Sequence, residues 1–283
     1  MKTSDFDYHL PQELIAQTPV EPRDSSRLLV LSRSDGAIQH SRFHDLPRFL
    51  RKGDLLVFND SRVFPARLHG KRLGTDTLVE IFLLTRLESD TWRALVKPGK
   101  RLRTGARFLI GDIEGEVLSV EPDGSRTVRL PLDDAQLHAL GEVPLPPYIR
   151  QPLADPERFQ TVYSRVEGSV AAPTAGLHFT PRLLDELRGM GVGLGFVTLH
   201  VGWGTFKPIE VENVADHAMH AEAYSLSEDT ADAINRAKRE GRRVIVVGTT
   251  AVRLLESRAA MTPDGTLTPG SGWTDIFITP GHR

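Results

Sequence analysis

The pattern of hydrophobic and polar positions predicts two buried strands. Residues 54–58 form an almost continuous apolar run that ends in the polar residues 59–62, and residues 244–247 form a second apolar run. Unbroken apolar runs of strand length are typical of strands that are buried on both faces of a sheet. Two further strands are expected over residues 27–32 and 196–201.

Helix signals become frequent in the second half of the chain. Thr180 and Pro181 predict a helix start, because threonine caps helix N-termini and proline suits the first helical position. The apolar residues that follow share one face, and a glycine lies beyond the predicted end: Leu183, Leu184, Leu187, Met190 and Gly191. Ser227 is expected to cap a second helix that Gly241 ends, and a third helix is expected over residues 251–260.

Residues 67–132 carry a different pattern. Short stretches of strand-like composition are separated by turn residues such as Pro98-Gly99 and Gly111-Asp112. The predicted strands cover residues 78–84, 92–96, 107–110, 116–120 and 127–130. A series of short strands without an intervening helix indicates a small antiparallel barrel or sandwich.

Outside this stretch, helices alternate with strands, which is typical of an α/β sheet. A short helix over residues 11–17 and a strand-like segment over 275–278 are the first and last elements expected. We therefore predict an α/β catalytic domain with an inserted antiparallel β-barrel domain. The α/β domain would comprise residues 1–65 and 146–283, and the barrel would comprise residues 66–145.

Composition excludes several classes of function. The 283 residues include no cysteine, which rules out disulfides, thiolate catalysis, thiolate-bound zinc and iron–sulfur clusters. The formal net charge is -2, so a basic surface for nucleic acid would have to be local. The N-terminus lacks the apolar core of a signal peptide, and no run approaches the roughly 18 apolar residues that span a bilayer. We expect a soluble, cytoplasmic monomer without membrane association.

Common nucleotide-binding, zinc-protease and nucleophile-elbow motifs are absent, but four segments could carry chemistry. Residues 168–180 are rich in small residues before a helix N-terminus, where free N–H groups can bind an anion; a plain surface loop is the alternative. In residues 198–206, Gly202 and Gly204 flank Trp203. This arrangement could let the backbone approach a ligand while the ring stacks on a purine, or it could be a tight turn around a core tryptophan.

The third segment, residues 216–222, combines two histidines with two acidic residues. If the segment is helical, His217 and His220 share a face, with Glu222 close by. General acid–base catalysis is favoured because histidine titrates near neutrality. A metal site is the weaker alternative because the familiar zinc spacings are missing, and we expect no metal.

The fourth segment, residues 247–253, has residues 59–62 as its counterpart. Each follows a predicted buried strand, and ligands of open α/β sheets bind beyond the carboxyl ends of the strands. Both segments are therefore candidates for a binding site, provided that the two strands run parallel.

The inserted stretch contains a local basic cluster. No acidic residue occurs from Lys97 to Arg107, and the interval also contains Lys100, Arg101 and Arg103. Lysine and arginine neutralise nucleic-acid phosphates without reading sequence. An ordinary solvated hairpin is the alternative.

Taken together, these segments resemble the S-adenosylmethionine:tRNA ribosyltransferase-isomerases of the queuosine pathway. The matching strings follow one another along almost the whole chain, at residues 54–68, 144–149, 163, 169–180, 196–202, 216–220 and 247–253. The resemblance implies that the ribosyl moiety of S-adenosylmethionine is transferred and isomerised onto 7-aminomethyl-7-deazaguanine in tRNA. Epoxyqueuosine-tRNA would form, and adenine and methionine would leave. S-adenosylmethionine would be a cosubstrate, with no permanently bound cofactor.

The chemistry of that reaction selects candidate residues. Removing a C5′ proton, protonating adenine and deprotonating the aminomethyl group call for groups that titrate near neutrality. The expected catalytic residues are His200, His217, His220, Asp216, Glu222 and Asp60. The residues expected to bind substrate are Asn59, Arg62, Thr174, Gly176, His178, Gly202, Gly204, Thr205, Gly248, Thr249, Thr250 and Arg253. The residues expected to bind tRNA are Lys97, Lys100, Arg101 and Arg103.

Two departures from the family pattern keep an alternative open. Residues 74–77 replace a Thr-Gly-Gly turn, which is expected to change only a hairpin tip. The family also continues past the Pro280-Gly281 position with a segment that holds Asn-Phe-His-Leu-Pro, so an inactive or noncatalytic RNA-binding member is the alternative reading. A methyltransferase would need a glycine-rich first strand-loop that is absent, and a metal-dependent hydrolase would rest on the histidines alone.

Overall fold

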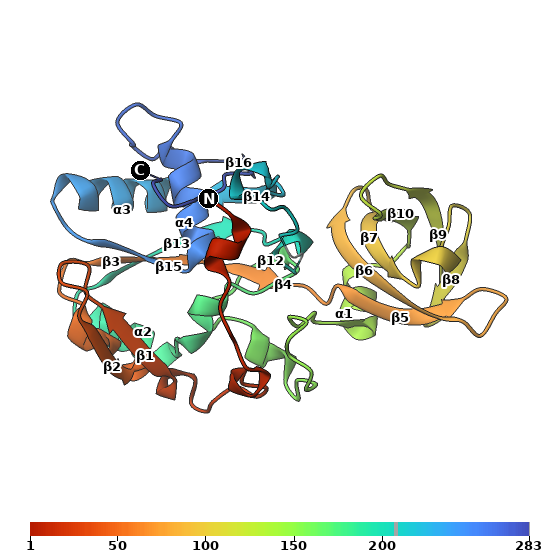
Figure 1. Cartoon of the computed structure of the whole chain (residues 1–283), viewed down its shortest axis with the longest axis horizontal. Helices are drawn as coiled ribbons and strands as arrows, with labels where there is room; N and C mark the ends of the chain where they lie inside the picture. Colours follow the sequence, from red (N-terminus) through yellow and green to blue (C-terminus); the bar gives the residue numbers. More distant parts are fainter. Residues whose placement is uncertain (207–208, 283) are drawn as a thin grey trace. The chain divides into compact units, whose positions relative to one another are not determined.

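The computed structural model describes residues 1–206 and 209–282, which form two compact units (Figure 1). The first unit comprises Met1–Arg62, Pro147–Glu167 and Ala172–Arg283, and the second comprises Val63–Pro146 and Gly168–Ala171. Within the described residues, every helix is too short or too polar to cross a lipid bilayer.

A five-stranded sheet forms the centre of the first unit. Its strands lie in the order β15 (Val244–Val247), β3 (Leu55–Asn59), β13 (Gly193–Leu199), β14 (Glu222–Leu226) and β16 (Gly270–Thr274). Strand β3 pairs in parallel with both β13 and β15, whereas β14 is antiparallel to β13 and β16. The carboxyl ends of β15, β3 and β13 therefore meet at one edge of the sheet, together with the start of β14.

Helices cover both faces of this sheet. Helix α2 (Pro181–Gly189) lies on one face, and α3 (Glu228–Arg239) and α4 (Thr249–Ala259) lie on the other (Figure 1). Every residue of β3 is buried. Its alternate side chains Leu56 and Phe58 pack with Leu183 and Leu187 of α2, as expected for a strand enclosed on both sides.

The predicted helix starts are confirmed. The Thr180 side chain accepts a hydrogen bond from the Leu183 N–H at 3.2 Å, and Ser227 accepts one from the Thr230 N–H at 3.4 Å. Each bond satisfies a backbone donor that has no partner inside the helix. Beyond the end of α2, Gly191 has φ +80°, a conformation that favours glycine.

The second unit is a closed antiparallel barrel. Six strands follow the order β5 (Arg67–Arg72), β6 (Leu78–Arg86), β7 (Thr91–Lys97), β10 (Arg126–Arg129), β9 (Ile113–Val120) and β8 (Arg107–Ile110). Pairing of β8 with β5 closes the ring. Helix α1 (Asp134–Leu140) precedes β11 (Gly141–Glu142), which pairs with β5. The barrel alternative is thus confirmed over the sandwich, and with it the predicted fold class.

The remaining elements are short. The other strands are β1 (Arg27–Leu31), β2 (Ile38–Arg42), β4 (Ser61–Val63) and β12 (Val166–Ser169). The 3₁₀ helices cover Thr3–Phe6, Gln12–Leu14, Arg23–Ser25, Phe43–Phe49, Gly99–Arg101, Pro156–Phe159, Thr174–His178, Trp203–Phe206 and Val214–Asp216.

Two predicted elements differ from the structure. The helix expected over residues 11–17 is only the 3₁₀ turn Gln12–Leu14, with the proline before it in an extended conformation. The last strand is β16 at Gly270–Thr274, not residues 275–278. The glycine-rich segment pairs along β14, whereas the apolar residues after it lie against a cavity, so their hydrophobicity does not mark a strand.

The barrel is expected to fold without the rest of the chain. We propose that the barrel folds alone, because its six strands and most of its fully buried side chains, among them Ile81, Leu83 and Phe108, lie within residues 63–146. A fragment spanning residues 63–146 should unfold cooperatively in urea. Phe108→Ala should lower its free energy of unfolding by about 3–5 kcal/mol. A broad, noncooperative transition of the unsubstituted fragment would contradict the proposal.

Candidate active site

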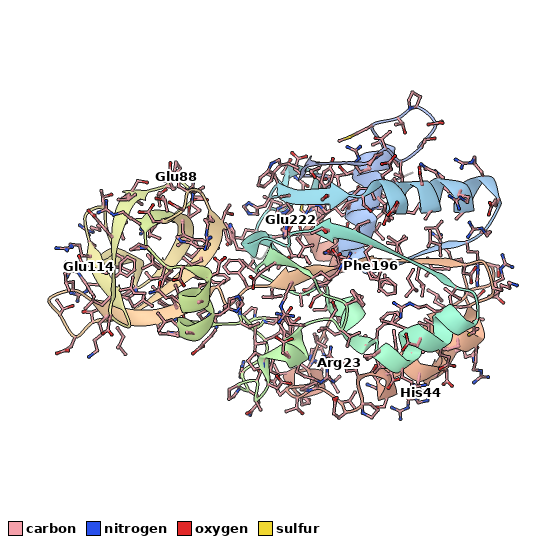
Figure 2. The ribbon with its side chains drawn as sticks, turned by 180° about the vertical axis from the view of Figure 1, so that it is seen from behind. Arg23, His44, Glu88, Glu114, Phe196 and Glu222 are labelled. Carbon is pink, nitrogen blue, oxygen red and sulfur yellow. The ribbon has the colours of Figure 1, made fainter. Side chains whose placement is uncertain are left out.

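A cavity of about 390 Å³ lies at the sheet edge where the strand ends meet. Its wall is drawn from the loop after β13, the segment before β14, the first turns of α4 and the segment after β16. Figure 2 labels Glu222, the first residue of β14 and part of this wall. The lining residues are Val201, Gly204, Thr205, His217, Met219, His220, Glu222, Thr249, Thr250, Val252, Arg253, Ile276, Phe277 and Ile278.

A buried ion pair between Arg253 and Glu222 holds the wall together. The Arg253 side chain is only 12% exposed, and its Nη1 donates to Glu222 Oε2. Its Nε donates to the Ile276 carbonyl at 3.1 Å, and its Nη2 donates to the carbonyls of His220 at 2.9 Å and Thr274 at 3.2 Å. Each guanidinium nitrogen thus has an acceptor inside the protein, which makes Arg253 a positioning residue for the wall.

The environment of Glu222 favours proton uptake. Burial raises the pKa of its carboxyl group, although the Gly202 N–H, the Arg253 guanidinium and His220 act in the opposite direction. The Gly202 N–H donates to Glu222 Oε1 at 2.8 Å. A carboxyl group with a raised pKa beside a cavity can exchange protons nearer to neutrality than an exposed one.

His217 and His220 both line the cavity, but not through a shared helix face. The 3₁₀ turn ends at Asp216, and His217 is extended with ψ 119°. The helical arrangement that was considered for residues 216–222 is therefore wrong. The His217 ring lies 5.4 Å from the Phe277 ring, and the His220 ring lies 4.9 Å from the Trp203 ring. The path of the extended chain, rather than helical periodicity, brings the two histidines together.

Gly204 is required by the packing of His220. A Cβ at Gly204 would lie 2.4 Å from His220 Cδ2, which is too close for any side chain. The glycine therefore lets the backbone approach an imidazole of the protein itself, whereas the sequence argument for this loop expected it to approach a ligand.

Asn59 joins three elements at the sheet edge. Its Nδ2 donates to the Leu199 carbonyl at 3.0 Å and to Thr250 Oγ1 at 3.1 Å, and its Oδ1 accepts from the Leu199 N–H at 3.1 Å. The side chain is fully buried. These bonds fix the end of β3 to the end of β13 and to the start of α4.

Asp60 and His200 belong to the opposite face of the sheet. The side chain of Thr198 donates to Asp60 Oδ1 at 2.7 Å, and Arg165 Nη2 donates to Asp60 Oδ2 at 2.7 Å. Because strand side chains alternate, His200 lies on the same face as Thr198, whereas Val201 faces the cavity. Burial lowers the pKa of His200, and the Asp60 carboxylate partly offsets the effect. The structure thus divides the predicted catalytic residues between two faces.

The small-residue segment contacts the start of α4. Gly248 has φ +87°, and a Cβ there would lie 3.3 Å from Ala175 Cβ. Gly176 packs against the buried Tyr163 hydroxyl group, which leaves no room for a side chain. Thr174 is exposed. Thr174, Gly176 and Gly248 are therefore not among the residues that line the cavity, whereas Thr249 and Thr250 are.

Three other predicted residues have separate partners. The imidazole Nδ1 of His178 lies 2.8 Å from the Ser26 hydroxyl, and burial and nearby Arg158 lower the pKa of that histidine. Arg62 donates to Ser164 Oγ at 3.1 Å and pairs with Glu157. Exposed Asp216 accepts a bond from Asn213 at 3.1 Å.

The structure shows no arrangement suited to a metal ion in the part of the chain that it describes. No group of three or more histidine, aspartate or glutamate side chains there comes close enough together to hold one.

The basic cluster lies on the second unit. Lys97, Lys100, Arg101 and Arg103 are exposed, and among the described side chains none has an acidic partner within ion-pair distance. Buried Arg126, which sequence reasoning missed, donates to the carbonyls of Leu102 at 3.0 Å and Gly99 at 3.2 Å. It thereby orders the turn that presents the cluster.

The apolar part of the cavity wall was also missed. Met219, Val252, Ile276, Phe277 and Ile278 line it. The apolar run 276–278 predicts a strand but forms part of the cavity wall, because an apolar sequence does not distinguish sheet pairing from a cavity lining.

Comparisons with known proteins agree over the whole chain. Residues 3–283 match the family model described as queuosine biosynthesis protein. The chain is 54% identical to the S-adenosylmethionine:tRNA ribosyltransferase-isomerase of Moorella thermoacetica and 52% identical to that of Acetivibrio thermocellus, covering 100% of this chain and 84% of each relative. A crystal structure of S-adenosylmethionine tRNA ribosyltransferase from Thermotoga maritima matches with a TM-score of 0.50 and 35% identity, over 99% of this chain and 80% of that chain.

The raised pKa of Glu222 predicts a pH-dependent stability. Between the ordinary glutamate pKa and the raised value, the native state keeps a proton that the unfolded state has released, so the free energy of unfolding falls as pH rises. In urea unfolding measured from about pH 4 to pH 7, the Glu222→Gln variant should not show the part of this decrease in unfolding free energy that Glu222 causes. Exposed Glu212→Gln is the matched control and should keep the wild-type dependence. Identical pH profiles for the wild type and Glu222→Gln would disprove the assignment.

Proposed function

The chain belongs to the queuosine biosynthesis protein family, and we infer from this membership that it is an S-adenosylmethionine:tRNA ribosyltransferase-isomerase. The observation that carries this conclusion is the similarity over all of this chain and 84% of the relative, with 54% of the residues identical to an enzyme of that name. Its substrates are S-adenosylmethionine and tRNA.

We propose the specific reaction that the family resemblance implies. The ribosyl moiety of S-adenosylmethionine passes to 7-aminomethyl-7-deazaguanine in tRNA and isomerises to give epoxyqueuosine, while adenine and methionine leave. The cavity at the sheet edge supports this proposal, because its volume and its mixture of apolar and polar walls suit a nucleoside. S-adenosylmethionine is then a consumed substrate, with no permanently bound cofactor.

The cavity contains groups suited to the required proton transfers. Glu222, His217 and His220 line the cavity, and Thr249 and Thr250 offer hydroxyl groups to a ribose. We assign the acid–base work to the first three residues. Asp60 and His200 lie on the other face of the sheet and are not among the residues that line this cavity, so this assignment does not include them. Burial there keeps the His200 imidazole uncharged over more of the neutral range.

The exposed cations of the barrel supply a surface for the tRNA backbone. Lys97, Lys100, Arg101 and Arg103 lie in or beside one turn, and phosphate groups would provide the anionic partners that these side chains lack among the described residues.

A turnover assay tests the function directly. The protein is incubated with S-adenosylmethionine and tRNA that carries the precursor base, and adenine and methionine are measured by chromatography. We expect equal release of both products, dependent on the modified tRNA. Glu222→Gln should lower kcat/KM by about 100-fold. Release of S-adenosylhomocysteine would indicate methyl transfer instead, and tRNA binding without consumption of S-adenosylmethionine would support the noncatalytic alternative.

The basic turn should affect tRNA binding more than chemistry. The triple variant Lys100→Gln, Arg101→Gln, Arg103→Gln should raise the KM for tRNA about tenfold and leave kcat unchanged. A plot of the logarithm of the tRNA binding constant against the logarithm of salt concentration should become shallower, with its slope reduced by about two to three.

A matched triple variant controls for loss of charge alone. Arg86, Arg107 and Arg129 pair with Asp134, Glu114 and Glu116, respectively. Their replacement by glutamine should change tRNA binding much less. Equal effects of the two triple variants would contradict a specific role of the turn.

A further inference from the structure

Phe277 and His217 form a corner in the cavity wall. Their ring centroids are 5.4 Å apart, and their planes are inclined at 65°. Both side chains line the cavity. A planar ligand cannot stack on both rings at once, but it can stack on one ring and present its edge to the other.

The surroundings of this corner favour stacking on Phe277. Ile276 and Ile278, the neighbours of Phe277 in sequence, also line the cavity, and Met219 and Val252 add further apolar lining. Such a surface suits the face of an aromatic base, whereas the imidazole edge of His217 carries nitrogen atoms that exchange hydrogen bonds and protons.

Arg253 fixes the position of the corner. Its guanidinium binds the carbonyls of Ile276 and His220, the residues next to Phe277 and at the end of the histidine segment. The two halves of the corner come from segments about 60 residues apart in sequence, and one side chain ties both segments to α4.

On the basis of the proposed function, we propose that the adenine ring of S-adenosylmethionine stacks on Phe277 and that His217 faces the nitrogen-bearing edge of the purine and protonates departing adenine. As the C1′–N9 bond breaks, its electron pair passes to adenine and a lone pair of the ribose O4′ forms a double bond to C1′. The proton of the His217 imidazolium moves to a purine nitrogen. The resulting neutral imidazole regains a proton from solvent before the next turnover.

Product inhibition tests the stacking site. Adenine should inhibit competitively against S-adenosylmethionine, and Phe277→Ala should weaken that inhibition about tenfold while inhibition by methionine stays unchanged. Phe277→Tyr retains the ring and should restore adenine inhibition, which separates stacking from a folding defect. Trp273→Ala, an exposed aromatic residue four positions away, should behave as the wild type. Unchanged adenine inhibition in Phe277→Ala would overturn the stacking site.

Chemical rescue tests the role of His217. His217→Ala should lower kcat about 100-fold, keep adenine inhibition within a few-fold of the wild type, and regain part of its rate when free imidazole is added. A merely structural histidine would give no imidazole response, and that result would overturn the catalytic assignment. Absence of adenine release by the wild-type enzyme would instead refute the proposed function, so the two failures are distinguishable.

Discussion

The parallel pairing of β3 with both of its neighbours is the constraint on which the candidate site depends. Phe58 lies opposite Phe196 in β13 and opposite Val247 in β15, so the three strands end at nearly the same level. Whatever follows each strand is thereby brought to one edge, although the segments are far apart in sequence. The buried Asn59 side chain then fixes this edge by bonding to β13 and α4.

Local signals were sufficient to predict most of the fold. The apolar run at 54–58, the caps Thr180 and Ser227, and the strand series of the barrel each depend on neighbouring residues, so they could be read from the sequence. Strand β14 could not, because its burial alternates regularly but one of its buried positions is the charged Glu222, so the sequence itself shows no clear apolar–polar alternation. Strand β16 escaped for a similar reason, since Gly270 and Gly272 have little strand propensity.

The sequence predicted which segments form the candidate site, but not how their side chains are arranged around the cavity. His217 and His220 do lie in one cavity, yet an extended path brings them there. Alternation places His200 on the other face, which requires knowing that backbone pairing continues one residue past β13, through the bond from the His200 N–H to the Ala223 carbonyl at 2.9 Å. Arg253 and Arg126 act mainly on backbone carbonyls, and a carbonyl acceptor leaves no mark in the sequence, so their positioning roles emerge only from the structure.

The wide sequence spacing of the cavity wall has a consequence for biosynthesis. All barrel strands are complete by Glu142, whereas the cavity needs β13, β14, α4 and the residues after β16. During translation the barrel can therefore fold while the central sheet still consists of β3 without its parallel neighbours. The apolar β3 has neither of its partner strands until β13 and β15 emerge, so both of its edges stay open to other chains during that interval.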